Sequence, residues 1–154
     1  MYQPNYFEEK RTEVIHALMR AHPLAALVAA THDGLVANHI PLDIRPVPAP
    51  FGTLRGHIAK VNPLWKIAGD TVRAVAIFQG PQGYVSPSWY PSKQQDAKVV
   101  PTWNYAVAHA HGTLRFIHDA AWLREFLEAL TSHNESGRPH PWWREWSTRS
   151  WVSS

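Results

Sequence analysis

The sequence contains no cysteine. Disulfide bonds, thiolate catalysis, zinc knuckles and iron–sulfur clusters are therefore excluded from its chemistry. The longest apolar run, Pro23 to Ala30, is far shorter than the roughly 20 residues that a membrane-spanning helix needs. The first ten residues are polar and acidic and do not resemble a secretory signal. From these absences we expect a soluble, cytoplasmic protein.

Charged residues are also few, at 18% of the 154 residues, and their balance is a mild +3. The basic residues are scattered and form no block of the kind that binds nucleic acid. No helix-turn-helix, G-x-S-x-G motif or glycine-rich phosphate loop is recognisable. The charge permits an anionic ligand or DNA without requiring either, so DNA is a weakly supported partner.

Aromatic residues, in contrast, are plentiful, with eight tryptophans in the chain. The segment Gly83 to Tyr105 combines Trp, Tyr, Pro, Lys and small polar residues between two strand-like runs. This mixture suits a surface on which flat rings stack beside a bound anion, and such loops on rigid scaffolds commonly form binding sites. For any single Trp, a place in the core is an equally good explanation.

The local patterns predict mainly antiparallel β structure with flanking helices, closed as a small barrel. An Asn5–Glu8 capping box predicts a helix from Tyr6 to Ala21, and Asp119 is expected to cap a last helix. Asn62 and Pro63 are expected to start a short helix, turns are expected at Gly80-Pro81 and Gly83, and a bulge or corner is expected at Gly112. The expected strands are Leu24–Thr31 and Leu35–Ile44, joined through Asp33-Gly34, then 53–59, 71–79 and 103–117.

The first candidate site lies where the expected strand 53–59 leads into the short helix. Its members are Arg55, His57, Lys60 and Asn62. Cationic side chains beside the free N–H groups of a helix start form a plausible phosphate site. An ordinary strand–helix turn with solvated charges explains the same pattern equally well.

Two further candidate groups lie within the aromatic segment. The first group, Ser86, Ser88, Trp89 and Lys93, joins ring stacking with hydroxyl and ammonium groups, although its Trp could instead fill the core. The second group is Thr102, Trp103 and Asn104, whose amide can pair with the edge of a heterocycle or satisfy a strand end. No residue has an evident acid–base role, so the catalytic residues are unknown.

Histidines offer one more constellation. His109 and His111 are two apart and so share a strand face, and His39 and His57 could approach them. Three histidines can bind a divalent metal, but no carboxylate accompanies these in sequence. We therefore expect no metal site.

Several motifs in one order resemble the PaiB-type family of FMN-binding negative transcriptional regulators, over Met1 to about Pro141. The segments that carry this resemblance are Met1-Tyr2 with Pro4 and Phe7, Ala37–Pro41, Gly56–Ala59, Asn62–Trp65, Phe78–Pro81, Tyr84–Lys93 and Val100–Tyr105. The resemblance implies a split β-barrel in residues 1–141, a homodimer, and FMN in a cleft between the subunits. It places the phosphate near Arg55 and Lys60 and the ring near the Trp89 and Trp103 loops.

The resemblance also leaves alternatives for function. Related split-barrel proteins include flavin-dependent oxidoreductases, and others bind or degrade haem, for which the histidines above are available. Family members continue with another strand after the region of Pro141, whereas this sequence stops soon afterwards. We expect residues 142–154 to be an atypical tail, either truncated or disordered.

Overall fold

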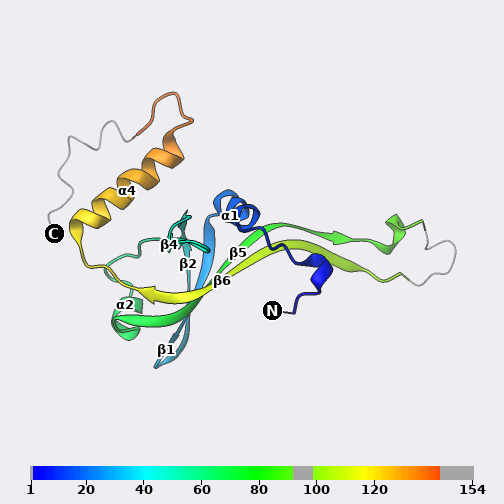
Figure 1. Cartoon of the computed structure of the whole chain (residues 1–154), viewed down its shortest axis with the longest axis horizontal. Helices are drawn as coiled ribbons and strands as arrows, with labels where there is room; N and C mark the ends of the chain where they lie inside the picture. The colour runs from blue at the N-terminus through cyan, green and yellow to red at the C-terminus, as the bar shows by residue number, and fades with distance from the viewer. Residues whose placement is uncertain (1, 92–98, 143–154) are drawn as a thin grey trace. The chain divides into compact units, whose positions relative to one another are not determined.

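The computed structural model describes residues 2–91 and 99–142. The chain divides into two compact units, Met1–Arg115 and Phe116–Ser154, which are treated separately (Figure 1). The first unit contains η1 (Asn5–Phe7), α1 (Thr12–Ala21), β1 (Leu24–Thr31), β2 (Gly34–Pro41), β3 (Asp43–Arg45), β4 (Thr53–Arg55), α2 (Leu64–Ile67), β5 (Thr71–Val85), η2 (Pro87–Trp89) and β6 (Thr102–Arg115). The second unit contains α4 (Ala120–Glu135).

The strands form two antiparallel sheets. The larger sheet has four strands in the order β2-β1-β5-β6, and the smaller sheet pairs β3 with β4. The prediction of a mainly β, antiparallel protein with flanking helices is therefore confirmed. In the described residues, however, the strands are divided between two sheets and no single closed barrel is formed.

One face of the larger sheet is buried. Ala25, Leu27 and Ala29 of β1 and Ala76 and Phe78 of β5 are almost inaccessible to solvent. Because side chains alternate along a strand, these residues share one face. Helix α1 contacts β5, β3 and β6 and contributes buried side chains of its own. We call the buried face of the larger sheet the inner face.

The opposite face of the same sheet, the outer face, is only half-buried. Its centre is apolar and consists of Val28 of β1, Val75 and Ile77 of β5, and Val107 of β6. Beyond Val107, the same alternation places His109 and His111 on this face. The outer face thus combines apolar side chains with a pair of imidazoles.

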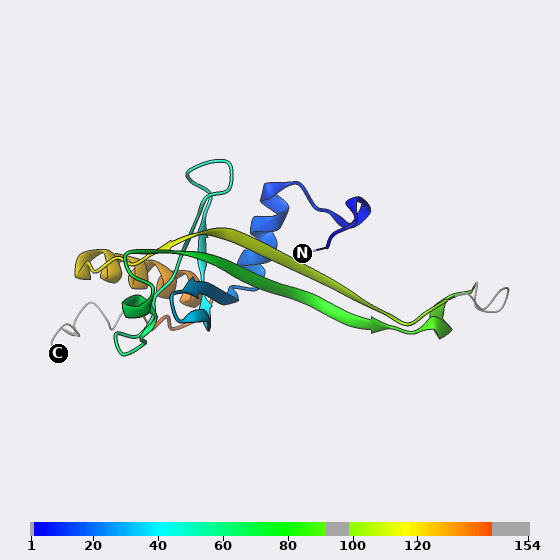
Figure 2. The same cartoon turned by 90° about the horizontal axis from the view of Figure 1, so that it is seen from below.

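Strands β5 and β6 continue far beyond the rest of the sheet. Strand β1 pairs with β5 only over Ala74–Ile77, whereas β6 pairs with β5 as far as Val85. At roughly 3.3 Å per residue, the eight steps from Ile77 to Val85 carry the hairpin about 26 Å past the last β1 contact. We call residues 80–91 and 99–106 the arm, which is plain in Figures 1 and 2.

The arm corrects the predicted turns at Gly80-Pro81 and Gly83, because β5 runs through both. The register shifts by one residue between Gln79 and Gln82, so the extra residue is absorbed as an irregularity within the strand. A Cβ at Gly80 would lie 2.6 Å from the Leu18 side chain of α1. The crossing of α1 therefore favours glycine here, because a larger side chain would displace Leu18. The bulge predicted at Gly112 is wrong, since Gly112 pairs in register with Ala74.

The first helix begins later than predicted, at Thr12 instead of Tyr6. Asn5 starts a short 3-10 turn instead of capping an α-helix. The Glu9 carboxylate accepts hydrogen bonds from the Arg11 backbone N–H at 2.9 Å and from its guanidinium at 2.9 and 2.7 Å. These bonds lower the pKa of Glu9 to about 2. They hold the chain in a non-helical conformation up to Arg11, so that the helix starts after it.

Three other local predictions have mixed outcomes. The β1–β2 hairpin is confirmed, with Thr31 opposite Gly34, but β2 ends at Pro41 before a separate β3. Strand β4 ends at Arg55, not Ala59. Its chain then passes so close to Leu42 that a Cβ at Gly56 would lie 2.6 Å from the Leu42 side chain.

The second unit is built around α4. Asp119 caps it as predicted, its carboxylate accepting from the backbone N–H groups of Ala121 at 2.8 Å and Trp122 at 3.2 Å. The Trp122 ring stacks on the buried Phe126 at 5.5 Å. None of the helices within residues 2–91 and 99–142 has the length and apolar character needed to cross a membrane.

Candidate functional site

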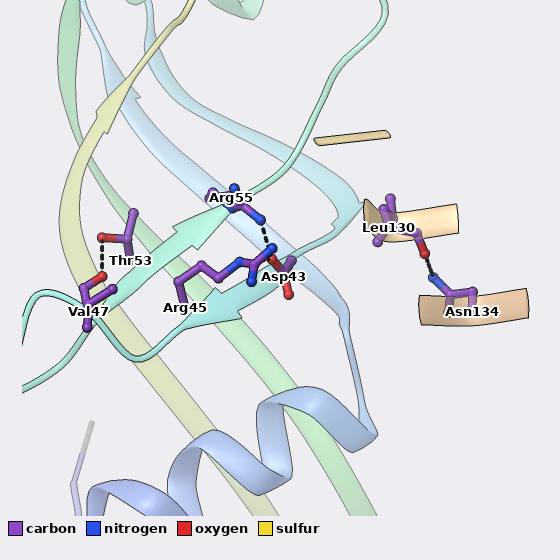
Figure 3. Close-up of polar contacts among 7 residues, drawn as sticks. All are labelled: Asp43, Arg45, Val47, Thr53, Arg55, Leu130 and Asn134. Atoms are coloured by element: carbon purple, nitrogen blue, oxygen red, sulfur yellow. Dashed lines mark hydrogen bonds and ion pairs between the residues drawn. The ribbon is translucent and has the colours of Figure 1, made fainter. Parts of the chain in front are cut away.

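The predicted phosphate-binding residues lie on one segment, between the end of β4 and the start of α2. Arg55 is largely buried, and its guanidinium donates to the Asp43 carboxylate at 2.9 Å (Figure 3). The same carboxylate oxygen lies 3.0 Å from Nε of Arg45. Because β3 and β4 pair Asp43 directly with Arg55, the carboxylate fixes the position of Arg55.

Both the nitrogen and the oxygen of the Asn62 side-chain amide form hydrogen bonds. Its Nδ2 donates to Oδ1 of Asn38 on β2 at 2.7 Å, and its Oδ1 accepts from the backbone N–H of Leu64 at 2.9 Å. The second bond caps α2, as predicted, although Pro63 already has helical dihedral angles. With only four residues, α2 adds little dipole, so anion binding here depends on side-chain cations.

The exposed members of this segment are His57 and Lys60. The backbone carbonyl of Lys60 accepts a hydrogen bond from the Trp65 indole at 3.0 Å, which fixes the turn. Lys66 lies over the same indole ring, 5.2 Å from its centroid. The sequence analysis missed Lys66, Asp43 and Arg45. For Asp43 and Arg45, the available signal was an acidic and a basic residue two positions apart on one strand.

The second group of predicted residues lies on the arm, where strand pairing separates it into two faces. Gln82 pairs with Tyr105 and Tyr84 with Trp103, so these four side chains share one face. The Trp103 indole donates to Oε1 of Gln82 at 3.0 Å, and its ring lies 6.3 Å from that of Tyr84. The other face carries only small or polar side chains. Its members are Gly83, Val85, Thr102 and Asn104.

This alternation divides one predicted group. Trp103 lies on the aromatic face of the arm, whereas Thr102 and Asn104 lie on the small face. The sequence analysis treated the three as one cluster because they are consecutive. In an extended strand, consecutive side chains point to opposite sides, so either Trp103 or the pair Thr102 and Asn104 can face a given ligand, but not all three.

The remaining arm residues lie near its described end. The hydroxyl of Ser86 accepts from the backbone N–H of Ser88 at 3.2 Å, which starts the 3-10 turn η2. Trp89 ends this turn with 70% of its surface exposed. Lys93 lies outside the described residues. The serines thus shape a turn that presents Trp89 to solvent.

The segment predicted to bind phosphate lies far from the outer part of the arm within one chain. Asn62 bonds to Asn38, which is opposite Leu27, and Leu27 is in turn opposite Ala76 on β5. From Ala76 the strand runs nine further residues to Val85, about 30 Å at roughly 3.3 Å per residue. Both views place η2 far from α2 (Figures 1 and 2).

The histidines are dispersed as well. His39, Ala26, Ile77 and His109 form one row across the sheet. His39 and His109 are thus three strand spacings apart, about 14 Å. Within the described part of the chain, no group of three or more His, Cys, Asp or Glu side chains could hold a metal ion. His109 and His111 are neighbours, with ring centroids 6.2 Å apart, and burial together with the charge of His111 lowers the pKa of His109.

Each half of this arrangement fits part of FMN. Arg55 and Lys60 offer the guanidinium and ammonium groups that bind phosphate. Asn104 and Thr102 offer amide and hydroxyl groups for the polar edge of a flavin ring. Trp89 and Trp103 offer exposed rings. The chemistry of the donors therefore fits the cofactor, provided that the two halves are brought together.

Comparison with known proteins agrees with this chemistry. The chain spans 63% of an uncharacterized protein of Saccharomyces cerevisiae, with 35% identity over 69% of its own length. It is 29% identical, over 92% of its length, to the protease synthase and sporulation protein PAI 2 of Bacillus subtilis, of which it spans 65%. An uncharacterized protein of Emericella nidulans is 30% identical over 88% of this chain and 67% of its own.

The family match is broader than any of these pairwise similarities. A family described as "Putative FMN-binding domain" matches residues 1–152. Together with the Bacillus subtilis relative, this match confirms the PaiB-type resemblance and FMN as the cofactor. The chain belongs to this FMN-binding domain family.

Proposed function

We propose that this protein is a PaiB-like homodimer that binds FMN noncovalently at sites shared between two copies, and that it acts as a negative transcriptional regulator in the cytoplasm. The observation that carries the proposal is the separation of the two halves of the candidate site. Side chains suited to a phosphate and side chains suited to a ring are both present, yet about 30 Å of β5 separate Ala76, which lies level with Asn62, from Val85 near the end of the described arm. A second copy can supply the missing half to each.

In this proposal the segment after β4 binds the phosphate. Arg55, held by Asp43, offers a preorganised guanidinium, and the exposed Lys60 adds a second positive charge. His57 and Asn62 border the same turn, and the amide of Asn62 keeps the turn against β2. Thr102, Asn104, Ser86, Ser88 and Trp89 approach the ring from the arm of the partner. Bound FMN supplies the capacity for hydride or electron transfer.

The two antiparallel sheets are consistent with the split barrel that the family resemblance implies. Regulation of transcription is supported by the PaiB-type resemblance, not by any recognised DNA-reading element. We therefore propose that the flavin state or occupancy is sensed and passed to another component, with DNA a weaker candidate for direct contact.

The proposal is tested by titrating the purified protein with FMN and following flavin absorbance and fluorescence. Saturable binding is expected. Lys60→Ala, which removes an exposed ammonium, should weaken binding about 10-fold or more, and the double variant with Arg55→Ala should weaken it further. Lys10→Ala removes an equal charge that is paired with Glu8, and it should leave FMN affinity unchanged. Equal affinity in all variants would show that the phosphate binds elsewhere.

A further inference from the structure

The two faces of the arm differ sharply in size and exposure. Tyr84, Trp103 and Tyr105 share one face and are 51%, 54% and 57% exposed. The opposite face has Gly83, a Val, a Thr and an Asn at the corresponding positions. Large aromatic side chains that remain exposed together are a recognised mark of interaction surfaces. The aromatic face is therefore the part of the arm that has the features of an interaction surface.

The composition of the arm indicates what kind of partner it has. Between residues 80 and 106 the sequence has three charged residues, Lys93, Asp96 and Lys98, all in the segment 92–98 that lies outside the described residues, and the described part of the arm has none. A surface for nucleic acid would need lysine or arginine to meet the phosphates. The cores of protein–protein interfaces are instead depleted in charged residues and enriched in Tyr and Trp. The arm has the second composition, so a protein partner is favoured.

Continuity with the sheet extends this surface. Along β6, Trp103, Tyr105, Val107 and His109 are alternate residues and lie on one side of the strand. The aromatic face thus continues into the half-buried outer face, opposite the face that α1 covers. The small face, with Asn104, continues into the inner face through Ala106 and Ala108. The two faces are separate surfaces along the length of the hairpin.

We propose that the aromatic face of the arm, formed by Tyr84, Trp103 and Tyr105, is the surface through which two copies of this chain pair. The small face, with Thr102 and Asn104, is then the one turned toward the ligand. The second copy is the occupant because the shared site, on which this inference rests, is incomplete without it. Trp103 is accordingly an interface residue and not a flavin-stacking one.

The geometry of Trp103 supports this role. Its indole N–H is already bonded to Gln82 on the same face, which holds the ring in one orientation across the hairpin. The neighbouring Tyr84 ring packs against it at a tilt of 56°. Rings that are fixed before association lose little side-chain entropy when they are buried, which favours tight pairing.

The test compares one variant of each face in FMN-free protein, with the monomer–dimer equilibrium measured by analytical ultracentrifugation. Trp103→Ala and Tyr84→Ala should each raise the dimer dissociation constant, by about 30-fold where the side chain is a hot spot. Asn104→Ala should leave that constant unchanged. In FMN titrations the pattern reverses. Asn104→Ala should bind FMN weakly at every protein concentration. Trp103→Ala should regain FMN affinity as the protein concentration is raised, because dimers then form again.

The outcomes separate this inference from the proposed function. Unchanged dimerisation in both Trp103→Ala and Tyr84→Ala, with circular dichroism like that of the wild type, would overturn the inference even if FMN binds. Loss of dimerisation in these variants would support it even if no flavin binds, and only the proposed function would then fail. A wild-type protein that is monomeric at all concentrations overturns the inference outright. Tyr105→Ala provides an independent third substitution on the same face.

Discussion

Single residues in the candidate site can be explained either by ligand binding or by a structural role, and Asn62 shows why sequence cannot separate the two explanations. An amide beside a strand–helix turn is a reasonable ligand-binding group on composition alone. In the folded chain its donor and acceptor already join β2 to α2. The cap could be predicted from the Asn-Pro pair. The bond to Asn38 could not, because it depends on a partner 24 positions away whose proximity is created by the fold.

Asn62→Ala should therefore destabilise the protein in the absence of any flavin. It removes a helix cap and leaves Asn38 without its part-buried partner, at a cost of about 1–3 kcal/mol. Urea denaturation measures the free energy of unfolding. The matched control is Asn134→Ala on α4, whose amide bonds only to the Leu130 carbonyl on an exposed surface (Figure 3). If wild type and Asn62→Ala are equally stable, the structural role of Asn62 is contradicted and only a ligand-binding role is left for it.

His109 provides a prediction about pH. Its pKa in the folded protein is lowered below the ordinary 6.5 by burial and by the charge of His111. Between the two values the unfolded chain binds more protons than the folded one, so stability rises with pH across that window. Stability should be fully present above 6.5 and should fall as the pH drops through the folded pKa.

Melting temperatures measured on either side of 6.5 test this expectation. His109→Gln should flatten part of the pH dependence, whereas His39→Gln, in the same row at the far edge of the sheet, serves as the control. The effect is modest because much of the imidazole remains in contact with water. A histidine NMR titration with a His109 midpoint at or above 6.5 would contradict the argument.

At the scale of elements, the sequence was most informative where the controlling interactions are local. The Asp119 cap and the β1–β2 hairpin depend on neighbours within a few residues, and both were predicted. Gly80-Pro81 was interpreted as a turn because this pair usually marks one. The structure keeps it in a strand, since β6 supplies a partner and α1 needs the space at Gly80. Those contacts are tertiary and leave no local signal.

The packing of α1 over the hairpin can be tested at Gly80. A β-branched side chain there would overlap Leu18 and approach the Ala106 carbonyl, so Gly80→Val should cost about 1–3 kcal/mol of stability. Gly112→Val is the matched control, because no atom lies within 4 Å of its Cβ position. Thermal unfolding should show a lower melting temperature for Gly80→Val alone. Similar melting temperatures for Gly80→Val and Gly112→Val would mean that α1 shifts easily to make room for the larger side chain.

At the scale of the whole molecule, the candidate site could be predicted residue by residue but not as an assembly. The expected strand 103–117 contains both Trp103 and Asn104, so strand alternation alone separates these two side chains. The distance between Asn62 and the arm depends on the length of β5, which the predicted turns concealed. The length of strand between the two halves, about 30 Å from Ala76 to Val85, is the reason for proposing that the flavin site is shared by a pair of chains.

A shared site makes a prediction that a site within one chain does not. One variant, Arg55→Ala with Lys60→Ala, loses the phosphate half, and another, Asn104→Ala, loses part of the ring half. In a mixed dimer, the intact arm of the first variant meets the intact phosphate segment of the second, so one of the two sites is restored. With equal amounts and random pairing, about a quarter of all sites should recover wild-type affinity.

Flavin titration of the mixture, after exchange of subunits, measures this recovery. Each variant alone should bind weakly, and the mixture should show a tight fraction that grows with the fraction of mixed dimers. Adding Trp103→Ala to both variants should abolish the recovery at low protein concentration, because pairing itself is weakened. A mixture that binds no better than the average of its components would locate both halves of the site in one chain. The 30 Å separation would then have to close by movement of the arm, not by exchange between copies.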